Sequence, residues 1–118
     1  MAYTNEFLEK PMDYASEVNY AIRHLRCAYR DTKANGWEVL VIRDIGFAED
    51  AVDMVNAMKL FHVDDVLVTD RSTAVMAYLT TLVENGWRVV GTSTVKANDG
   101  YTFGYHAEIK GLHMKLGE

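Results

Sequence analysis

The sequence is poor in cysteine, which can cross-link a fold through disulfides, and in proline, which interrupts helices and strands. Its 118 residues include one cysteine, Cys27, and one proline, Pro11. A single cysteine excludes an intramolecular disulfide, and no cysteine and histidine pair has zinc-finger spacing. No apolar run reaches the roughly 20 residues of a membrane-spanning helix, and the first residues lack the basic and apolar regions of a signal peptide. We therefore expect a cytoplasmic protein, of the source cell or of a host, with no membrane segment.

Positive charge is also scarce. Lysine and arginine number 12 against 17 acidic residues, which gives a formal net charge of -5. Nucleic-acid-binding domains are usually basic because they neutralise phosphates, so this balance makes nucleic acid an unlikely partner and suits a basic protein. The length predicts one domain that is long enough to bury a hydrophobic core. We expect residues 1–11 to form an arm and residues 12–118 a single domain.

The tripeptide Asn-Gly-Trp is present twice, at residues 35–37 and 85–87. Each copy follows a stretch with helical apolar spacing and precedes a run typical of a strand. Glycine adopts the left-handed conformation that ends helices at no steric cost. Both copies therefore predict a helix that ends at Gly36 or Gly86 and a strand that begins at the following tryptophan.

The periodicity of apolar residues predicts three helices and four strands in the order α-β-α-β-α-β-β. The helices are expected over residues 13–34, 48–61 and 71–85, and the strands over residues 37–42, 65–69, 87–96 and 101–116. Strands joined through helices should be parallel. The sequence thus predicts an α/β fold with a four-stranded mixed sheet, helices packed on it and a C-terminal β-hairpin.

Several positions within these elements have an expected role. Asp13 and Asp70 are expected to be N-caps, and Gly111 is expected to form a bulge in the last strand. The continuous apolar runs at residues 39–42 and 66–68 indicate strands covered on both faces. The third helix should turn inward the apolar residues Val75, Leu79, Leu82 and Val83.

The loops after the first two strands are the best candidates for a ligand site. In open α/β sheets, ligands bind at the carboxyl ends of parallel strands, and a helix N-terminus with basic and hydroxyl side chains suits a phosphate or carboxylate. The alternative is that Asp70 caps a helix whose first turn is solvated. The candidate residues for an anionic ligand or nucleotide are Arg43, Asp44, Asp70, Arg71, Ser72 and Thr73.

The last strand offers a candidate interaction surface. Its residues alternate between apolar and polar, which indicates one covered and one exposed face. If the strand lies at the edge of the sheet, it could pair with a twin strand and form a homodimer. The residues proposed for the exposed face are Thr102, His106, Glu108 and Lys110.

One segment is similar to part of the serine recombinase catalytic domain. Residues 65–71, a helix, and residues 84–90 follow the order of that family: an apolar strand, an Asp-Arg pair, a helix and a strand led by glycine. The nucleophilic serine of the family lies on an N-terminal strand, whereas this chain opens with a predicted helix. The strand at residues 37–42 leads into Arg43-Asp44-Ile45 without a serine. The resemblance implies a shared α/β pattern and no recombinase activity.

The residues suggest a protein that binds rather than catalyses. The four histidines lack metal-ligand spacing, so we expect no catalytic residues, no metal and no cofactor. The first hypothesis is a small acidic protein-binding module, comparable to phage or mobile-element regulators and inhibitors that dock on a host protein. The alternatives are a domain for a small anionic ligand or nucleotide, and a hydrolase-like enzyme in which Asp44, Asp70 and a histidine converge.

Overall fold

The chain forms an α/β fold with a four-stranded mixed sheet, as the sequence predicts. A computed structural model describes residues 3–10, 19–43, 51–69, 75–97 and 107–117. A short additional helix precedes the predicted series. The elements are α1 Glu6–Glu9, α2 Tyr20–Asn35, β1 Leu40–Ile42, α3 Ala51–Leu60, β2 Asp65–Thr69, α4 Val75–Glu84, β3 Trp87–Ala97 and β4 Ala107–Leu116.

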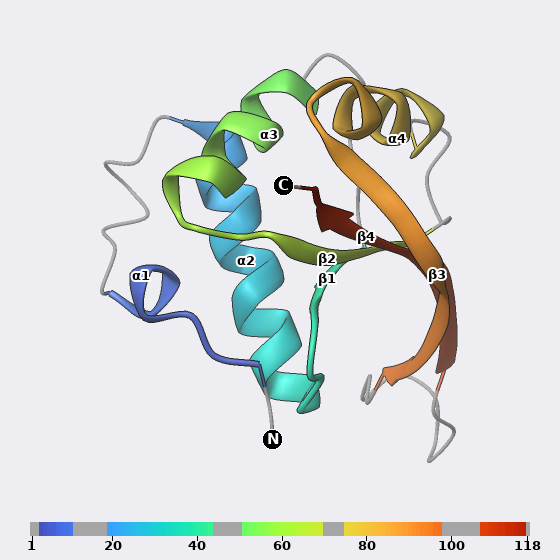
Figure 1. Ribbon diagram of the computed structural model, residues 1–118. Helices are drawn as coiled ribbons and strands as arrows, with labels where there is room; N and C mark the ends of the chain where they lie inside the picture. The colour runs from blue at the N-terminus through green and yellow to red at the C-terminus, as the bar shows by residue number, and fades with distance from the viewer. Residues whose placement is uncertain (1–2, 11–18, 44–50, 70–74, 98–106, 118) are drawn as a thin grey trace.

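The strands are arranged in the order β1-β2-β4-β3 (Figure 1). β1 and β2 are parallel, and β4 is antiparallel to both of its neighbours, β2 and β3. The C-terminal strand therefore lies inside the sheet, and the expectation that it forms an edge is wrong. The connection through α4 places β3 two positions away from β2, and β4 lies between them. A homodimer through the last strand thereby loses its structural premise.

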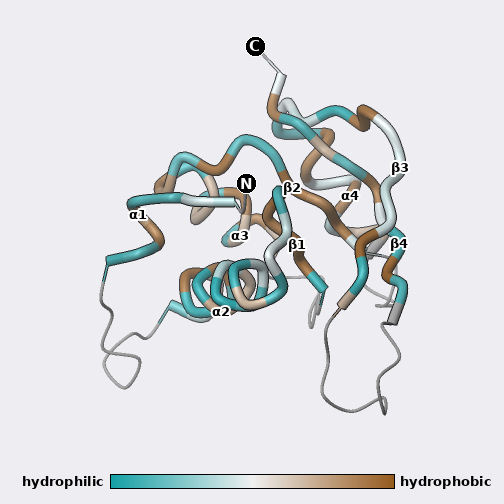
Figure 2. Tube along the Cα trace, turned by 90° about the horizontal axis from the view of Figure 1, so that it is seen from below, coloured by the Kyte–Doolittle hydropathy of each residue, from teal (hydrophilic) through white to brown (hydrophobic). Residues whose placement is uncertain are grey.

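A helix-side core lies between the sheet and the helices α2, α3 and α4. α3 packs against both α2 and α4, and Figure 1 shows the three helices on one side of the sheet. Figure 2 shows hydrophobic residues along the middle of β1 and β2. The fully buried side chains of this core include Leu25, Leu40, Ile42, Met54, Met58, Val63, Val66, Leu82 and Met114.

A smaller far-side core covers the other face of the same strands. It consists of Trp37, Val41, Leu67, Ala97 and Ile109. Neighbouring residues of a strand point to opposite faces, so Leu40 and Ile42 belong to the helix-side core while Val41 belongs to the far-side core. The prediction that the apolar runs mark strands covered on both faces is confirmed.

β4 changes its buried face along its length. Ile109 packs in the far-side core, whereas Leu112 and Met114 contact the helix-side core. The pairing continues without interruption through Gly111, and the irregularity of the hairpin lies on β3 between Val89 and Gly91. The predicted bulge at Gly111 is therefore wrong. Ile109 and Leu112 are three residues apart, so they point to opposite faces of a regular strand, and no bulge is needed to explain the change of buried face.

The two Asn-Gly-Trp copies end helices as predicted. Gly36 has a φ of 68° and Gly86 a φ of 93°, both in the range that favours glycine. The predicted start of the first long helix is wrong, because Asn19 caps α2 with an extended backbone and accepts from the Ile22 amide. Asp13, the predicted cap, lies outside the described residues, as does Asp70.

One predicted strand boundary and one predicted inward-facing residue differ from the structure. β1 pairs over Leu40–Ile42 only, so Trp37 precedes the strand. In α4, Leu82 is buried but Val83 is 55% exposed. The prediction that Val83 turns inward is therefore wrong, because successive helical residues are about 100° apart and point in different directions. Tyr78 is buried at the position that completes the inward stripe.

α2 covers the outer side of β1. The Val41 amide donates to Thr32 Oγ1 at 3.1 Å, and the Trp37 amide donates to the Thr32 carbonyl at 3.1 Å. The Trp37 indole also donates to the Lys96 carbonyl at 2.9 Å, which joins the segment before β1 to the distal end of β3. The sheet is therefore curled, and one tryptophan links its two outer strands.

The N-terminal segment packs against α2 and the segment before β1. Leu8 is buried in the helix-side core, the Tyr3 amide donates to the Trp37 carbonyl at 2.8 Å, and the Asn5 amide donates to the Tyr29 hydroxyl at 3.1 Å. None of the helices in the described ranges has the length and apolar character needed to cross a membrane.

Candidate functional site

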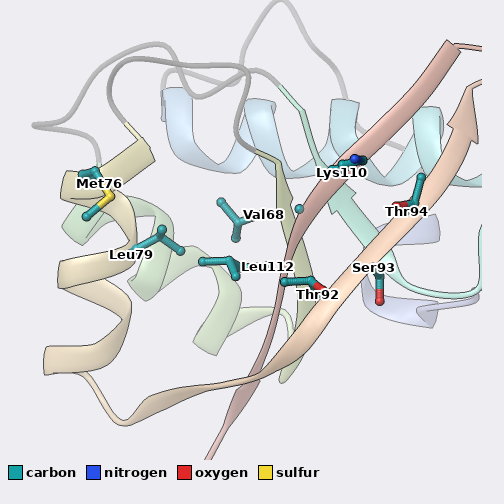
Figure 3. A pocket seen from close by; sticks show the side chains of 9 residues that line it. Val68, Met76, Leu79, Thr92, Ser93, Thr94, Lys110 and Leu112 are labelled. Atoms are coloured by element: carbon teal, nitrogen blue, oxygen red, sulfur yellow. The ribbon is translucent and has the colours of Figure 1, made fainter.

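A cavity of about 580 Å³ lies between α4 and the β3–β4 hairpin, at the carboxyl end of β2 (Figure 3). It is lined by Val68, Met76, Leu79, Thr92, Ser93, Thr94, Lys110, Gly111 and Leu112. These residues come from four elements that are far apart in the sequence. The cavity therefore exists only in the folded chain.

One side of the cavity is apolar and the other is polar. Val68 and Leu112 lie at its centre with Met76 and Leu79 of α4 on one side, while Thr92, Thr94 and Lys110 lie on the hairpin side (Figure 3). Thr92 pairs with Leu112 and Thr94 with Lys110. Directly paired residues share a face of the sheet, so these side chains project together from the face that the helices cover.

The cavity forms because the strands differ in length. β2 has 5 residues and β3 has 11, so the distal half of the hairpin extends past the strand on which α4 packs. α4 contacts β2 and β3, and Trp87 at the start of β3 is buried. Further along the hairpin the same face is exposed at Thr92, Thr94 and Lys110. The apolar floor therefore meets a polar wall at the boundary of the helix layer.

The electrostatic character of the cavity is set by one lysine. Among the described residues that line it, Lys110 is the charged group, and none is acidic. The neighbouring pair on the same face, Lys96 and Glu108, places opposite charges across the hairpin. A hydroxyl-bearing wall with an ammonium group and an apolar floor suits a ligand that combines a negative charge with an apolar body.

The cavity lies at the strand end where the sequence predicts a ligand. Thr69, the residue before the predicted loop, is buried, and its hydroxyl lies 3.2 Å from the Ile42 carbonyl and 3.1 Å from the Arg43 carbonyl. This contact holds the ends of β1 and β2 side by side. Five of the residues proposed for the anion site, Asp44, Asp70, Arg71, Ser72 and Thr73, lie outside the described residues.

Arg43 is held by a neighbour and does not line the cavity. Its Nε and Nη2 donate to the two carboxylate oxygens of Asp31 at 2.8 Å and 2.6 Å, and its guanidinium lies 5.3 Å from the centre of the Trp37 ring. A smaller pocket of about 260 Å³ adjoins it, with His24 and Cys27 of α2 in its lining. An anion at Arg43 would have to compete with the Asp31 carboxylate.

The predicted interaction face is described in part. Glu108 and Lys110 are exposed and point to the same side of β4, and Lys110 belongs to the cavity. Thr102 and His106 lie outside the described residues. Lys110, which was predicted to belong to an interaction face, thus also lines the cavity.

The histidine and carboxylate pair of the described chain lies on the opposite face of the sheet. His113 Nε2 contacts Asp65 Oδ1, and both side chains alternate with residues of the helix-side core. Within the described ranges, no group of three histidine, cysteine or acidic side chains is placed to hold a metal ion.

Sequence reasoning missed the threonines and the α4 residues of the cavity. Thr92-Ser93-Thr94 is a polar run in the middle of a strand whose beginning, Trp87, is buried. Such a change from apolar to polar on one face is the signal that could have indicated where the helix layer stops. Leu79 was predicted to be core, and it does contact the helix-side core while lining the cavity.

Comparison with known proteins gives a family without a known role. A family model described as "Domain of unknown function (DUF7698)" matches residues 24–116, from α2 to the end of β4. No curated protein and no solved structure matches the chain.

Proposed function

Because this chain belongs to that family of unknown function, we propose a role from its own geometry: a non-enzymatic binding domain for a small amphipathic anion. The ligand has an apolar body, which contacts Leu79 and Leu112, and an anionic group beside Lys110. This proposal is a more specific form of the second hypothesis from the sequence, a domain for a small anionic ligand. It places the ligand at the β3–β4 hairpin and not at Arg43.

The observation that carries the proposal is the cavity itself. Its volume of about 580 Å³ falls in the range of roughly 300–1,000 Å³ typical of small-molecule sites. Such sites combine an apolar lining with a few convergent polar groups. The hydroxyls of Thr92 and Thr94 and the ammonium of Lys110 supply these groups here.

A binding role agrees with the chemistry of the described lining. A lysine without a described acid or base partner in the cavity does not form an acid/base pair, and the His113–Asp65 pair lies on the other face of the sheet. The hydrolase-like alternative, which relies on Asp44 and Asp70, stays a prediction. So does the hypothesis of a phage-type regulator or inhibitor that docks on a host protein.

Two probes of equal chain length test the ligand class. We expect octanoate to bind and to shift the NMR signals of Thr92, Thr94 and Lys110, whereas neutral octan-1-ol should bind about 10-fold more weakly, a difference of about 1.4 kcal/mol. Equal affinities for the two compounds, or shifts confined to other residues, would remove Lys110 from the proposal.

The matched variants are Lys110→Met and Lys115→Met, which remove the same charge from opposite faces of β4. We expect Lys110→Met to lower octanoate affinity about 10-fold, or about 1.4 kcal/mol, and to leave octan-1-ol affinity unchanged. Lys115→Met should change neither affinity. A titration calorimeter measures all four values, and circular dichroism verifies that both variants fold.

A further inference from the structure

The outer side of β3 is the open edge of the sheet in the part of the chain that the structure describes. The other edge, β1, is covered by α2 and satisfied by Thr32. On β3, the described backbone contact from outside the sheet is the Trp37 indole at the Lys96 carbonyl. Unpaired amides and carbonyls on an exposed strand are a template for another strand.

Residues 88–96 of the open edge are exposed, except Ser93 and Val95, which are half-buried. Val89 is 51% exposed and Val90 is 44% exposed. A Cβ built on Gly91 would meet no atom within 4 Å. Gly91 therefore has open space on the face of the sheet toward which a side chain would project.

The irregularity at Val90 limits where a partner strand can pair. It divides β3 into a short part before Val89 and a regular part after Gly91. An edge bulge disturbs the ladder and opposes long edge-to-edge association. Between this bulge and the contact at Lys96, residues 91–95 form a regular stretch as long as an average strand, about 5 residues. Two copies of the chain would share only this short stretch.

The net positive charge of the β3–β4 hairpin favours an acidic partner. Both charged side chains of β3, Arg88 and Lys96, are basic. β4 adds two lysines and one glutamate, so the two strands together carry a formal charge of +3 while the whole chain carries -5. Two copies placed edge to edge would bring like charges together, whereas an acidic segment is attracted.

We propose that the edge of β3 over residues 91–95 binds an extended, acidic segment of another protein by strand addition. The backbone of the segment continues the sheet next to β3, and its carboxylates lie near Arg88 and Lys96. This surface shares Thr92, Ser93 and Thr94 with the lining of the cavity. It uses the backbone edge of these residues, whereas the cavity ligand contacts side chains and the apolar floor.

Synthetic peptides test the proposal on the full chain. The probe is a capped octapeptide of alternating Glu-Glu and Val-Val pairs, which carries carboxylates on both faces when extended. It is compared with its Lys and Val counterpart and with the same acidic peptide N-methylated at every residue. We expect the acidic peptide to bind, with NMR shifts along residues 91–95. The basic and the N-methylated peptides should bind at least 10-fold more weakly. Equal binding of the N-methylated peptide would overturn strand addition.

Charge reversal supplies the matched variants. Arg88 and Lys96 are exposed, so Arg88→Glu with Lys96→Glu should fold, which circular dichroism verifies. We expect this double variant to lose about 10-fold in affinity for the acidic peptide and to retain octanoate binding. Unchanged affinity for the acidic peptide would overturn the charge argument. A dimer in sedimentation equilibrium that the acidic peptide cannot dissociate would show a second copy as the occupant instead.

Discussion

At Gly111 the absence of a side chain decides how closely two strands approach. A Cβ built there would lie 2.6 Å from the Val68 carbonyl oxygen and 3.0 Å from its carbon. Both atoms belong to the backbone of β2, which cannot move without disturbing the sheet. Glycine suits this position because the backbone of β2 leaves no room for a Cβ, and not because of the backbone conformation of Gly111.

We expect Gly111→Ala to lower the free energy of unfolding by about 1–3 kcal/mol, the usual cost of overpacking. The control is Gly91→Ala on the paired strand, where a Cβ meets nothing within 4 Å and the change should be below about 0.5 kcal/mol. Urea denaturation measures both. Equal losses in the two variants would contradict the contact with Val68.

Glu9 is the titratable residue that fastens α1 to α2. Lys33 Nζ lies 2.6 Å from its carboxylate, and the Tyr29 hydroxyl donates to the same oxygen at 2.8 Å. The hydrogen bond from Lys33, followed by that from Tyr29, lowers the pKa of Glu9. A lowered carboxyl pKa means that the contact stabilises the docked segment above the ordinary glutamate pKa and is lost as the pH falls through the lowered value.

We therefore expect amide-exchange protection at Leu8 and Glu9 to decrease as the pH falls below about 4.5, the ordinary value for glutamate. In Glu9→Gln the protection should be lower at neutral pH and should not change over that range. Protection factors measured by NMR at each pH test this. A wild-type profile as flat as that of the variant would rule out Glu9 as the fastening group.

Among the elements, α2 and β1 depend on each other through one hydroxyl. Thr32 is fully buried, and its Oγ1 accepts from the Val41 amide. Thr32→Val keeps the shape but leaves that buried amide without its acceptor, which costs about 1–3 kcal/mol. Thr32→Ser keeps the hydroxyl and should cost less, chiefly the loss of one methyl group. Chemical denaturation of the two variants gives the comparison, and a smaller loss for valine than for serine would be the contrary result.

Element type could be predicted from the sequence because it depends on local patterns. The glycines after α2 and α4 and the apolar runs of β1 and β2 are such patterns, and the structure confirms them. Strand order could not be predicted, because apolar alternation reports burial and says nothing about which strand lies next to which. The start of α2 was misplaced because Asp13 and Asn19 are equally good caps by residue type.

The cavity was harder to predict for the same reason. Its lining is drawn from β2, α4 and both strands of the hairpin, and each segment alone looks like ordinary core or ordinary surface. A general rule for α/β sheets led the sequence-based prediction to the carboxyl end of β2, where the cavity lies. It named Lys110 as exposed but gave no way to place that residue opposite Leu79.

On the scale of the whole molecule, each core contains one tryptophan. Trp87 belongs to the helix-side core and Trp37 to the far-side core. Strands β1 and β2 contribute alternate residues to both cores, and β4 contributes to each core from a different part of its length. Neither core can therefore lose its sheet while the other keeps it. The two cores should therefore unfold together.

We expect Trp37→Phe and Trp87→Phe each to show a fluorescence transition, from the remaining tryptophan, that coincides with the circular dichroism transition. Trp37→Phe also loses the bond to the Lys96 carbonyl, which lowers stability by about 1 kcal/mol. Denaturation monitored by both signals provides the test. Separate midpoints within one variant would mean that the two cores are independent units.

The cover that α2 places over β1 also limits how large an assembly built on this sheet can become. A sheet with two free edges can add molecules at both ends and extend into a filament. With α2 covering β1 and Thr32 accepting from its Val41 amide, additions are restricted to the side of β3 among the described edges. Two copies joined edge to edge through β3 would each keep β1 covered, so such a pair would end as a dimer and would not extend into a filament.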